Sequence, residues 1–378
     1  MNIKLLPILA VLQAVPFTVL ADEADDWFNQ SSASFESDEA VAASLDDNTV
    51  ALSPEECAAY TYTNTVNPDA PFKKGKGGIY SVGTVPEARA ITPKTCSSAA
   101  MERYANAANL YNETFGGRVR VYCMPIPLSS AFYTPDEITI GGNQHSYIRK
   151  AFSFLDEGVT GVDIYPILGM HAEEPIYSRT DHHWAPLGAY YAAAQFASQA
   201  GVPFLTLDQY EAVEIPDYVG TMYKFSGLTD IKNSPETFVY YKPTGVDYNT
   251  TYITYKLDSG RHRVVSASEP WDGKFFLPFK GSSTYCTFMG GDEKLTKVVT
   301  STKNGRKVLI LKDSFGNAIP GYLFGSFEEV HVADCRYCTQ NLKDYVEEQG
   351  ITDILFANNL DHASTEKTTN MYKHYLEQ

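Results

Sequence analysis

Basic residues are scarce in this chain and are missing from a long section near its start. No Lys or Arg stands between Lys4 and Lys73, and the whole sequence has 30 Lys and Arg against 46 Asp and Glu. The formal net charge is −16. Such a balance argues against nucleic acid and anionic lipid headgroups as partners, because both need a basic surface. An anionic polymer would require a local basic patch.

Long apolar runs are also rare, and one stretch alone is apolar enough to meet a membrane. It follows Lys4, continues to Leu20 and ends at Ala21, just before an acidic segment. This layout is typical of a secretory signal peptide over residues 1–21 with cleavage after Ala21. The alternative is an uncleaved anchor, because about 17 apolar residues approach the minimum for a spanning helix. We therefore expect a secreted or extracytoplasmic protein of the cell envelope.

Cysteines are few for a chain of 378 residues, and their number is even. In an exported protein an even number favours structural disulfides, although fifteen pairings are possible. Cys335 and Cys338 have the C-x-x-C spacing of redox and zinc sites, but a zinc site needs a second pair and a redox site needs a thioredoxin-like context. Disulfides remain the favoured interpretation. The six cysteines are Cys57, Cys96, Cys123, Cys286, Cys335 and Cys338.

The pattern of apolar residues predicts an α/β domain with a β-rich insertion. Residues 22–54 are acidic and rich in Ser and Ala, which predicts a flexible leader. Residues 55–215 and 306–378 alternate strand-like and helix-like runs, as in a parallel sheet covered on both faces. Residues 216–305 contain short β-like runs at 237–241, 251–255, 262–266, 275–279 and 297–300. The strands expected in the α/β part are 118–126, 161–167, 306–312, 329–333 and 353–357, and its helices are 101–111, 144–157, 186–200, 318–327, 341–349 and 366–376.

Four chemically active side chains stand together before one of these helices, in Asp181-His-His-Trp184. Pro186 and the apolar stripe after it mark the helix start. Residues two apart on an extended segment point to the same side. Asp181 can therefore orient His183 while His182 faces elsewhere.

Ser314 follows a predicted buried strand and begins a helical turn. A serine hydroxyl becomes a good nucleophile only when a base removes its proton, and the usual base is a histidine held by a carboxylate. His183 and Asp181 supply that pair from the end of another strand, so the sequence predicts a Ser314-His183-Asp181 triad. In the purely structural alternative, Ser314 and Asp313 only cap a turn.

The motifs Asp181-His-His-Trp184, Lys312-Asp-Ser-Phe315 and Asp334-Cys-Arg-Tyr337 resemble those of the DHHW protein family. More distantly, the chain is similar to the SGNH-hydrolase-like O-acetyltransferases of alginate acetylation systems, which share a Thr-Asp-x-His-Trp motif and a Gly-Asp-Ser-like turn. His182 stands where those relatives carry a small polar residue, and Lys312 replaces their glycine.

This resemblance implies a three-layer α/β/α SGNH-hydrolase-like sheet that is circularly permuted, since Asp181 and His183 precede Ser314 here. It also implies that Ser314 is the nucleophile, His183 the base and Asp181 its orienting partner. In such a permuted sheet an asparagine after a later strand would contribute to the oxyanion hole, and Asn358 or Asn359 occupies that place.

Three more side chains are candidates for substrate binding: Trp184, Arg179 and Arg336. A core position for Trp184 and salt bridges for the two arginines are the structural alternatives. The remaining histidines are scattered without metal-ligand spacing, so we expect no metal and no cofactor beyond an acetyl donor of unknown identity.

The favoured function is an O-acetyltransferase that modifies a cell-envelope or secreted polysaccharide through an acyl-Ser314 intermediate, with a membrane-bound acyltransferase partner supplying the acetyl group. A carbohydrate esterase (a deacetylase) would use the same triad, with water in place of the sugar hydroxyl. A metal-dependent phosphoesterase and a non-catalytic surface glycan-binding protein are the alternatives from other classes.

Overall fold

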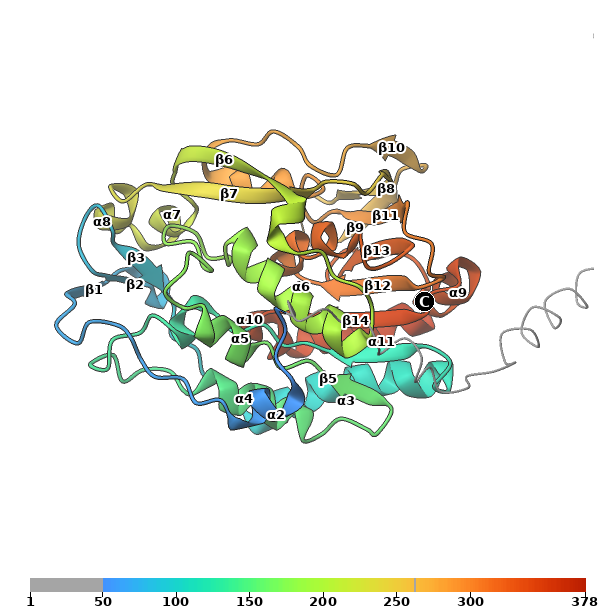
Figure 1. Cartoon of the computed structure of the whole chain (residues 1–378), viewed down its shortest axis with the longest axis horizontal. Helices are drawn as coiled ribbons and strands as arrows, with labels where there is room; N and C mark the ends of the chain where they lie inside the picture. Colours follow the sequence, from blue (N-terminus) through green and yellow to red (C-terminus); the bar gives the residue numbers. More distant parts are fainter. Residues whose placement is uncertain (1–49, 262) are drawn as a thin grey trace, which may run out of the picture. The chain divides into compact units, whose positions relative to one another are not determined.

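A nine-stranded mixed sheet runs through the protein (Figure 1). The computed structural model describes residues 50–261 and 263–378. Five neighbouring strands are parallel, in the order β13-β12-β14-β4-β5. Their bounds are β4 Arg120–Cys123, β5 Val159–Gly161, β12 Lys307–Lys312, β13 Glu329–Asp334 and β14 Asp353–Ala357.

Antiparallel strands extend this sheet beyond β13. Strand β11 pairs with β13, β8 pairs with β11, and β9 and β10 both pair with β8. All four strands come from residues 216–305, so the segment predicted as an insertion continues the main sheet. The bounds are β8 Tyr248–Leu257, β9 Val264–Ala267, β10 Trp271–Gly273 and β11 Lys294–Thr300. Two further strands, β6 Tyr210–Tyr218 and β7 Glu236–Pro243, form a separate antiparallel pair.

Each face of the main sheet carries its own hydrophobic core. Alternate residues of a strand point to opposite faces, and Ile310 and Leu355 accordingly pack with helix α6 in one core, while Leu309 and Phe356 pack in the other. That second core contains side chains of α3, α9 and α11. The helix bounds are α3 Ser98–Phe115, α6 Pro186–Ala200, α9 Leu342–Gln349 and α11 Glu366–Glu377. The expected mixed α/β architecture with a largely parallel sheet is confirmed.

Helix α6 lies in front of the sheet in Figure 1 and carries the Asp-His-His-Trp loop at its N-terminus. Pro186 occupies the first turn, where its missing N–H costs nothing, and Gly201 ends the helix with a φ of 63°. Gly188 lets the helix approach the preceding loop, because a Cβ there would lie 2.3 Å from the carbonyl oxygen of Ile176. These contacts fix the loop against α6.

Three predicted elements differ in the structure. The strand expected at 161–167 is β5, which ends at Gly161, and helix α5 (Tyr165–Met170) begins where Pro166 favours a first helical turn. Residues 275–279 form no strand and pair only through a bridge from Phe276 to Phe288. The helix expected at 318–327 is instead two 3₁₀ helices, η6 (Ser314–Ala318) and η7 (Pro320–Leu323).

The expected disulfides are not formed, because all six cysteines are free. Five of them are buried, and there a thiol packs as a small apolar side chain. Cys123 lies in β4, for example, and the Cys57 thiol donates to the backbone carbonyl of Asp163.

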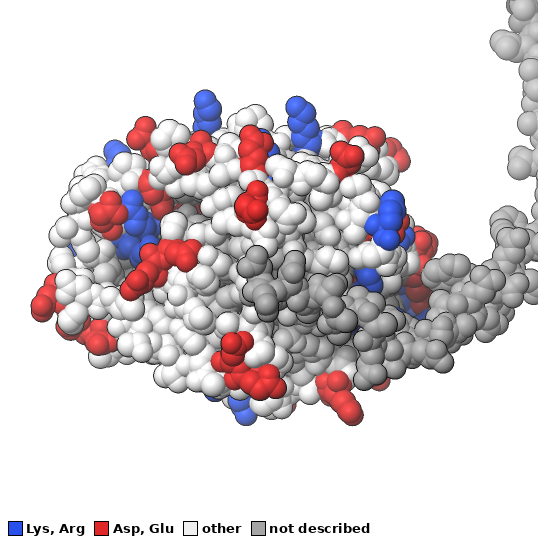
Figure 2. Space-filling model, in the orientation of Figure 1, with Lys and Arg blue, Asp and Glu red and all other residues white. Residues whose placement is uncertain are grey.

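The predicted signal peptide, residues 1–21, and most of the predicted leader lie outside the described residues. The end of that leader contacts the core: the Leu52 backbone exchanges two hydrogen bonds with the Gln195 side chain of α6. Among the residues that the structure describes, no helix is long and apolar enough to cross a membrane. Figure 2 shows Asp and Glu side chains scattered over one face of the molecule, with fewer Lys and Arg among them.

Candidate active site

Ser314 is the first residue of η6, directly beyond the parallel strand β12. Its hydroxyl oxygen lies 2.8 Å from Nε2 of His183. On the other side of that imidazole, Nδ1 lies 2.6 Å from Oδ1 of Asp181. The side chains of Asp181 and His183 are 2% and 9% exposed. The structure therefore brings the three predicted residues into one hydrogen-bonded line, although 131 positions separate His183 from Ser314.

The loop that carries Asp181 and His183 is closed on itself. Tyr177 and Trp184 form an antiparallel bridge across its base. Within the loop, Oδ1 of Asp181 also accepts a hydrogen bond from the backbone N–H of His183. Short side chains such as Asp form this local bond readily. The carboxylate thus holds both the backbone and the ring of His183.

Residues far from the motif complete the binding of Asp181. Its second oxygen, Oδ2, accepts hydrogen bonds from the backbone N–H of Thr221 at 2.8 Å and from the Thr221 hydroxyl at 2.9 Å. A Cβ on the neighbouring Gly220 would lie 2.4 Å from the Asp181 Cβ, so this approach requires glycine. Burial acts to raise the pKa of Asp181, but His183, His182 and the Thr221 N–H hold that pKa well below its ordinary value. Asp181 is therefore ionised.

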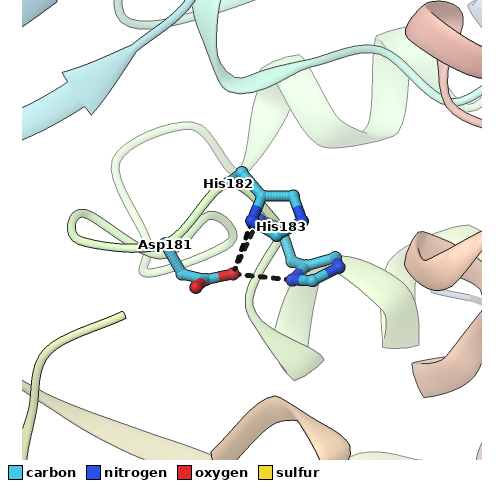
Figure 3. A group of neighbouring side chains, drawn as sticks. All are labelled: Asp181, His182 and His183. Carbon is cyan, nitrogen blue, oxygen red and sulfur yellow. Dashed lines mark hydrogen bonds and ion pairs between the residues drawn. The ribbon is translucent and has the colours of Figure 1, made fainter. Parts of the chain in front are cut away.

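His182 also turns the Nδ1 edge of its ring toward Asp181, as His183 does (Figure 3). Its Nδ1 lies 2.8 Å from the Thr221 hydroxyl oxygen and 3.5 Å from Oδ1 of Asp181. The Thr221 hydroxyl donates its proton to Asp181, so it can only accept from His182. Desolvation and the adjacent His183 lower the pKa of His182 to about 4, which makes the ring neutral at pH 7. The proton of this neutral ring is on Nδ1, and the lone pair of Nε2 remains for a ligand.

Asp181, His182 and His183 together offer three metal-ligand atoms within 4.8 Å of one another. Both Nδ1 atoms already contact the same carboxylate oxygen, Oδ1 of Asp181. A metal at this place would have to displace the proton between Asp181 and His183. The arrangement fits a triad better than a metal centre.

Tyr285 fixes the plane of the His183 ring. The two rings stack with centroids 3.8 Å apart and an interplanar angle of 4°. The Tyr285 hydroxyl donates to the carbonyl of Phe315, and Nε1 of Trp184 donates to the same carbonyl at 2.9 Å. Trp184 is completely buried. The structure thus places Trp184 in the core, where it holds the turn after Ser314, rather than in a substrate pocket.

The two asparagines predicted for the oxyanion hole both contact Asp313, which is itself completely buried. Asp313 accepts hydrogen bonds from the backbone N–H of Asn359 at 2.8 Å, from its Nδ2 at 3.1 Å and from Nδ2 of Asn358 at 3.4 Å. Oδ1 of Asn358 accepts from the hydroxyls of Tyr104 and Tyr372. Asn358 is enclosed by these bonds, whereas Asn359 reaches the pocket beside Ser314.

A group of four charges lies at the turn that carries Ser314: Lys312 and Asp334 are buried, and Asp292 and Arg336 are partly exposed. Nζ of Lys312 lies 2.7 Å from Asp334 and 3.2 Å from Asp292. Arg336 binds Asp334 through two nitrogens and lies 2.9 Å from Asp292. Burial acts to raise the pKa of Asp292, but Lys312 and Arg336 hold that pKa below its ordinary value. Lys312, which stands where the resemblance to alginate-type O-acetyltransferases would place a glycine, is thus neutralised by two carboxylates.

A pocket of about 200 Å³ opens beside Ser314. Of the substrate-binding candidates, Arg336 lines this pocket. Arg179 lies outside it, where the guanidinium pairs with Glu87 and bonds the Pro235 carbonyl. Sequence reasoning missed Thr221 and Tyr285, for which no local motif exists. The polar side chains of the pocket, besides Ser314, include Thr92, Ser129, His182, Arg336, Asn359 and His362.

Comparisons with known proteins show which proteins this chain is similar to. The chain is similar to a DHHW family protein from Eubacterium siraeum at 36% identity and a TM-score of 0.72, over 82% of this chain and 98% of that one. It is also similar to Bacillus cereus PatB1 with a sulfonyl adduct, at 16% identity and a TM-score of 0.62, over 77% and 98%. The O-acetyltransferase domain of Pseudomonas putida AlgJ matches at 13% identity and a TM-score of 0.40, over 81% and 99%.

A search of curated proteins finds no match. The sequence profile of the DHHW protein family matches residues 25–333, which include the Asp-His-His-Trp loop and the Ser314 turn. Together with the 36% identity to a solved member over most of the chain, this match shows that the protein belongs to the DHHW family.

Proposed function

We propose that this protein is an extracytoplasmic serine acyl-ester enzyme that transfers an acetyl group to a hydroxyl of a cell-envelope or secreted polysaccharide. One observation carries the proposal: His183 lies 2.8 Å from the Ser314 hydroxyl through Nε2 and 2.6 Å from the buried Asp181 through Nδ1. A serine, a histidine and an ionised carboxylate in this order are the requirements of acyl transfer.

In the first step Oγ of Ser314 attacks the carbonyl carbon of an acetyl ester or thioester, and its proton passes to Nε2 of His183. The donor's leaving group departs with that proton, and the acetyl group remains as an ester on Ser314. In the second step an acceptor hydroxyl attacks this ester, and its proton passes through His183 back to Oγ. Asp181 keeps the Nδ1 proton in place and stabilises the imidazolium in both steps.

Two donors are available for the negative charge that forms on the carbonyl oxygen. The backbone N–H of Ser314 is the first of η6 and has no carbonyl to bond within that helix. The Asn359 amide uses one of its two N–H groups for Asp313, and the other remains. Oxyanion stabilisation contributes a few kcal/mol per donor, so an Asn359→Ala variant should lose about a hundredfold in turnover.

The proposed fold is the circularly permuted, three-layer form of an SGNH-type sheet. Its support is the order of the active residues, since the Asp181 loop precedes the strand of Ser314 in the chain. The presence of a hydrophobic core on each face of the sheet also supports the three-layer arrangement.

Export and an acetyl donor belong to the same proposal. The signal-peptide pattern over residues 1–21 supports an extracytoplasmic location. Acetyl donors are made inside the cell, so a membrane-bound acyltransferase partner would have to supply the acetyl group.

The test is incubation with p-nitrophenyl acetate, with and without an acceptor glycan, followed by mass spectrometry of the Ser314 peptide. We expect an acetyl adduct on Ser314 and acetylated glycan. Ser314→Ala and His183→Ala should abolish both, and His182→Ala should weaken them less. Equal loss in all three variants would contradict these roles.

Controls separate the competing functions. A strong chelator should leave turnover unchanged, whereas a metal-dependent phosphoesterase would lose activity. Release of acetate without transfer to any glycan would identify a carbohydrate esterase. A glycan-binding protein without catalysis would keep its function in Ser314→Ala.

A further inference from the structure

Two more pockets lie near the one beside Ser314, although they share no lining residue with it. The middle pocket, of about 270 Å³, is lined by residues that include Pro93, Lys94 and Ile138. The outer pocket, of about 390 Å³, is lined by residues that include Tyr60 and Tyr62. Five residues line both of them: Ser130, Thr134, Gly142, Asn143 and Gln144. The middle and outer pockets are therefore one hollow.

This hollow is adjacent to the active-site pocket through two chain segments. Thr92 lines the active-site pocket, and the next residues, Pro93 and Lys94, line the middle one. Likewise, Ser129 lines the active-site pocket and Ser130 lines the middle one. An ion pair of 2.8 Å between Lys94 and Asp361 of the active-site pocket lies at the boundary. The active-site pocket and the hollow are therefore neighbours on the molecule.

Several aromatic side chains line the outer pocket. Tyr165 and Phe132 pack with centroids 4.9 Å apart, and Tyr62 meets both rings edge-on. The Tyr62 hydroxyl is fixed by the Phe132 carbonyl at 2.6 Å, and His145 stacks on Tyr165 at 4.4 Å. These rings are held rigid before any ligand binds, which lowers the entropy cost of binding. Phe132 and Tyr165 are buried and support the pocket from below, whereas Tyr60 and Tyr62 are partly exposed. An exposed tyrosine ring offers a flat apolar face with a polar tip, which suits the C–H face and hydroxyls of a sugar.

The lining of the middle and outer pockets is not acidic, although the molecule as a whole has a net charge of −16. Among the described residues, no carboxylate side chain lines either the middle or the outer pocket, although the chain has 46 Asp and Glu. Arg149 lines the outer pocket, is exposed, and donates to the Ala58 carbonyl through one nitrogen. A guanidinium has further donors for hydroxyl or carboxylate oxygens. A cationic ligand finds no partner there, whereas a neutral or acidic sugar does.

We propose that the middle and outer pockets bind sugar units of the acceptor chain several units away from the hydroxyl at Ser314. The inference rests on the proposed function for the reacting end and adds the substrate class: a neutral or acidic polysaccharide, recognised as a chain rather than as a single sugar. Contacts this far from the chemistry contribute to transfer by holding the acceptor in place.

The test measures binding of three oligomer series of one to six sugars to the full chain by calorimetry: β-1,4-linked glucose, β-1,4-linked N-acetylglucosamine and an oligouronate. We expect affinity in at least one series to rise with length and to level off once the outer pocket is filled. Arg149→Ala and Tyr60→Ala should each weaken the longest oligomer about tenfold and leave the monosaccharide unchanged. Lys150→Ala is the matched control, because this exposed neighbour on the same helix does not line the pocket. We expect it to bind like the unchanged chain.

Turnover of p-nitrophenyl acetate by the same variants separates this inference from the proposed function. Both pocket variants should retain it, which also shows that they fold. Affinity that is independent of length, no binding in any series, or unchanged binding by both pocket variants would overturn the inference, even if Ser314 is acetylated. Length-dependent binding that the variants weaken would support it even if Ser314 proves inert.

Discussion

The Thr221 hydroxyl links His182 to Asp181, and Asp181 in turn holds His183. The hydroxyl accepts from Nδ1 of His182 and donates to Oδ2 of Asp181, while Oδ1 holds His183. Both carboxylate oxygens are therefore occupied, and the direction of each hydrogen bond is fixed. The position of the His183 ring, the proposed general base, depends on a residue 40 positions from Asp181.

Thr221→Val removes this hydroxyl and keeps the side-chain shape. A lost hydrogen bond to a charged group should lower kcat/KM for p-nitrophenyl acetate about tenfold, with kcat carrying the loss. Thr250→Val is the matched control, because the buried Thr250 hydroxyl has no hydrogen-bond partner among the described residues. Equal activity in the two variants would contradict the role of Thr221.

His182 makes stability depend on pH in a predictable direction. Its folded-state pKa is about 4, below the ordinary value of 6.5. Between about pH 6.5 and pH 4 the unfolded chain binds a proton that the folded chain does not, so stability falls as the pH falls through this window. The His182→Asn variant should lose less stability between pH 7 and pH 4.5. The effect should be partial, because 38% of the His182 side chain is exposed and solvent screens its charge. Urea unfolding at pH 7 and pH 4.5 measures this, and the same decline in both proteins would contradict it.

That Asp181, His183 and Ser314 meet could be predicted from sequence, because each stands at the end of a recognisable element. Ser314 follows an apolar strand, and Asp181 and His183 precede a helix marked by Pro186. The residues that hold them could not be predicted. Thr221 and Tyr285 act through contacts between segments distant in sequence, and neither position carries a pattern that distinguishes it from an ordinary loop residue.

At the scale of elements, the buried parallel strands β12 and β14 were predictable, and the exposed strands β1 and β6 were not. Strands β12 and β14 read as continuous apolar runs because helices cover both of their faces. Strands β1 (Phe72–Lys74) and β6 show no such run, since β1 is wholly exposed and β6 mostly so. Their pairing with neighbours, rather than their composition, makes them strands.

The end of strand β12 depends on a buried lysine. Lys312→Met would leave Asp334 and Asp292 with Arg336 as their remaining cation, and removing one partner from such a buried group should cost about 3 kcal/mol of unfolding free energy. Lys307→Met at the start of the same strand is the control. Lys307 pairs with Glu329 but is 27% exposed, so its loss should cost under ~1 kcal/mol. Denaturant unfolding compares the two, and equal costs would contradict this account.

At the scale of the whole molecule, the segment predicted as an insertion contributes to both the sheet and the site. Strand β11 pairs with β13 over five residues. The same segment contributes Thr221 and Tyr285, which contact the triad, and Asp292, which pairs with Lys312 below it. Residues 50–378 cluster as one compact unit. Removing residues 216–305 would therefore dismantle the active site.

We expect this segment and the α/β part to unfold together. In native-state hydrogen exchange, amides of β11 should open with the same free energy as those of β12, because both strands are bonded to β13. Amides of the edge strand β10 should exchange faster and serve as the internal control. Opening of β11 at a lower denaturant concentration than β12 would show that the segment is an independent unit.

The six free thiols have a consequence for how the folded protein reacts with thiol reagents. Burial raises the pKa of every one of them, which keeps them protonated and unreactive at neutral pH. An alkylating reagent should therefore modify the unfolded chain readily and the folded chain slowly, so the rate of cysteine labelling reports how often the core opens.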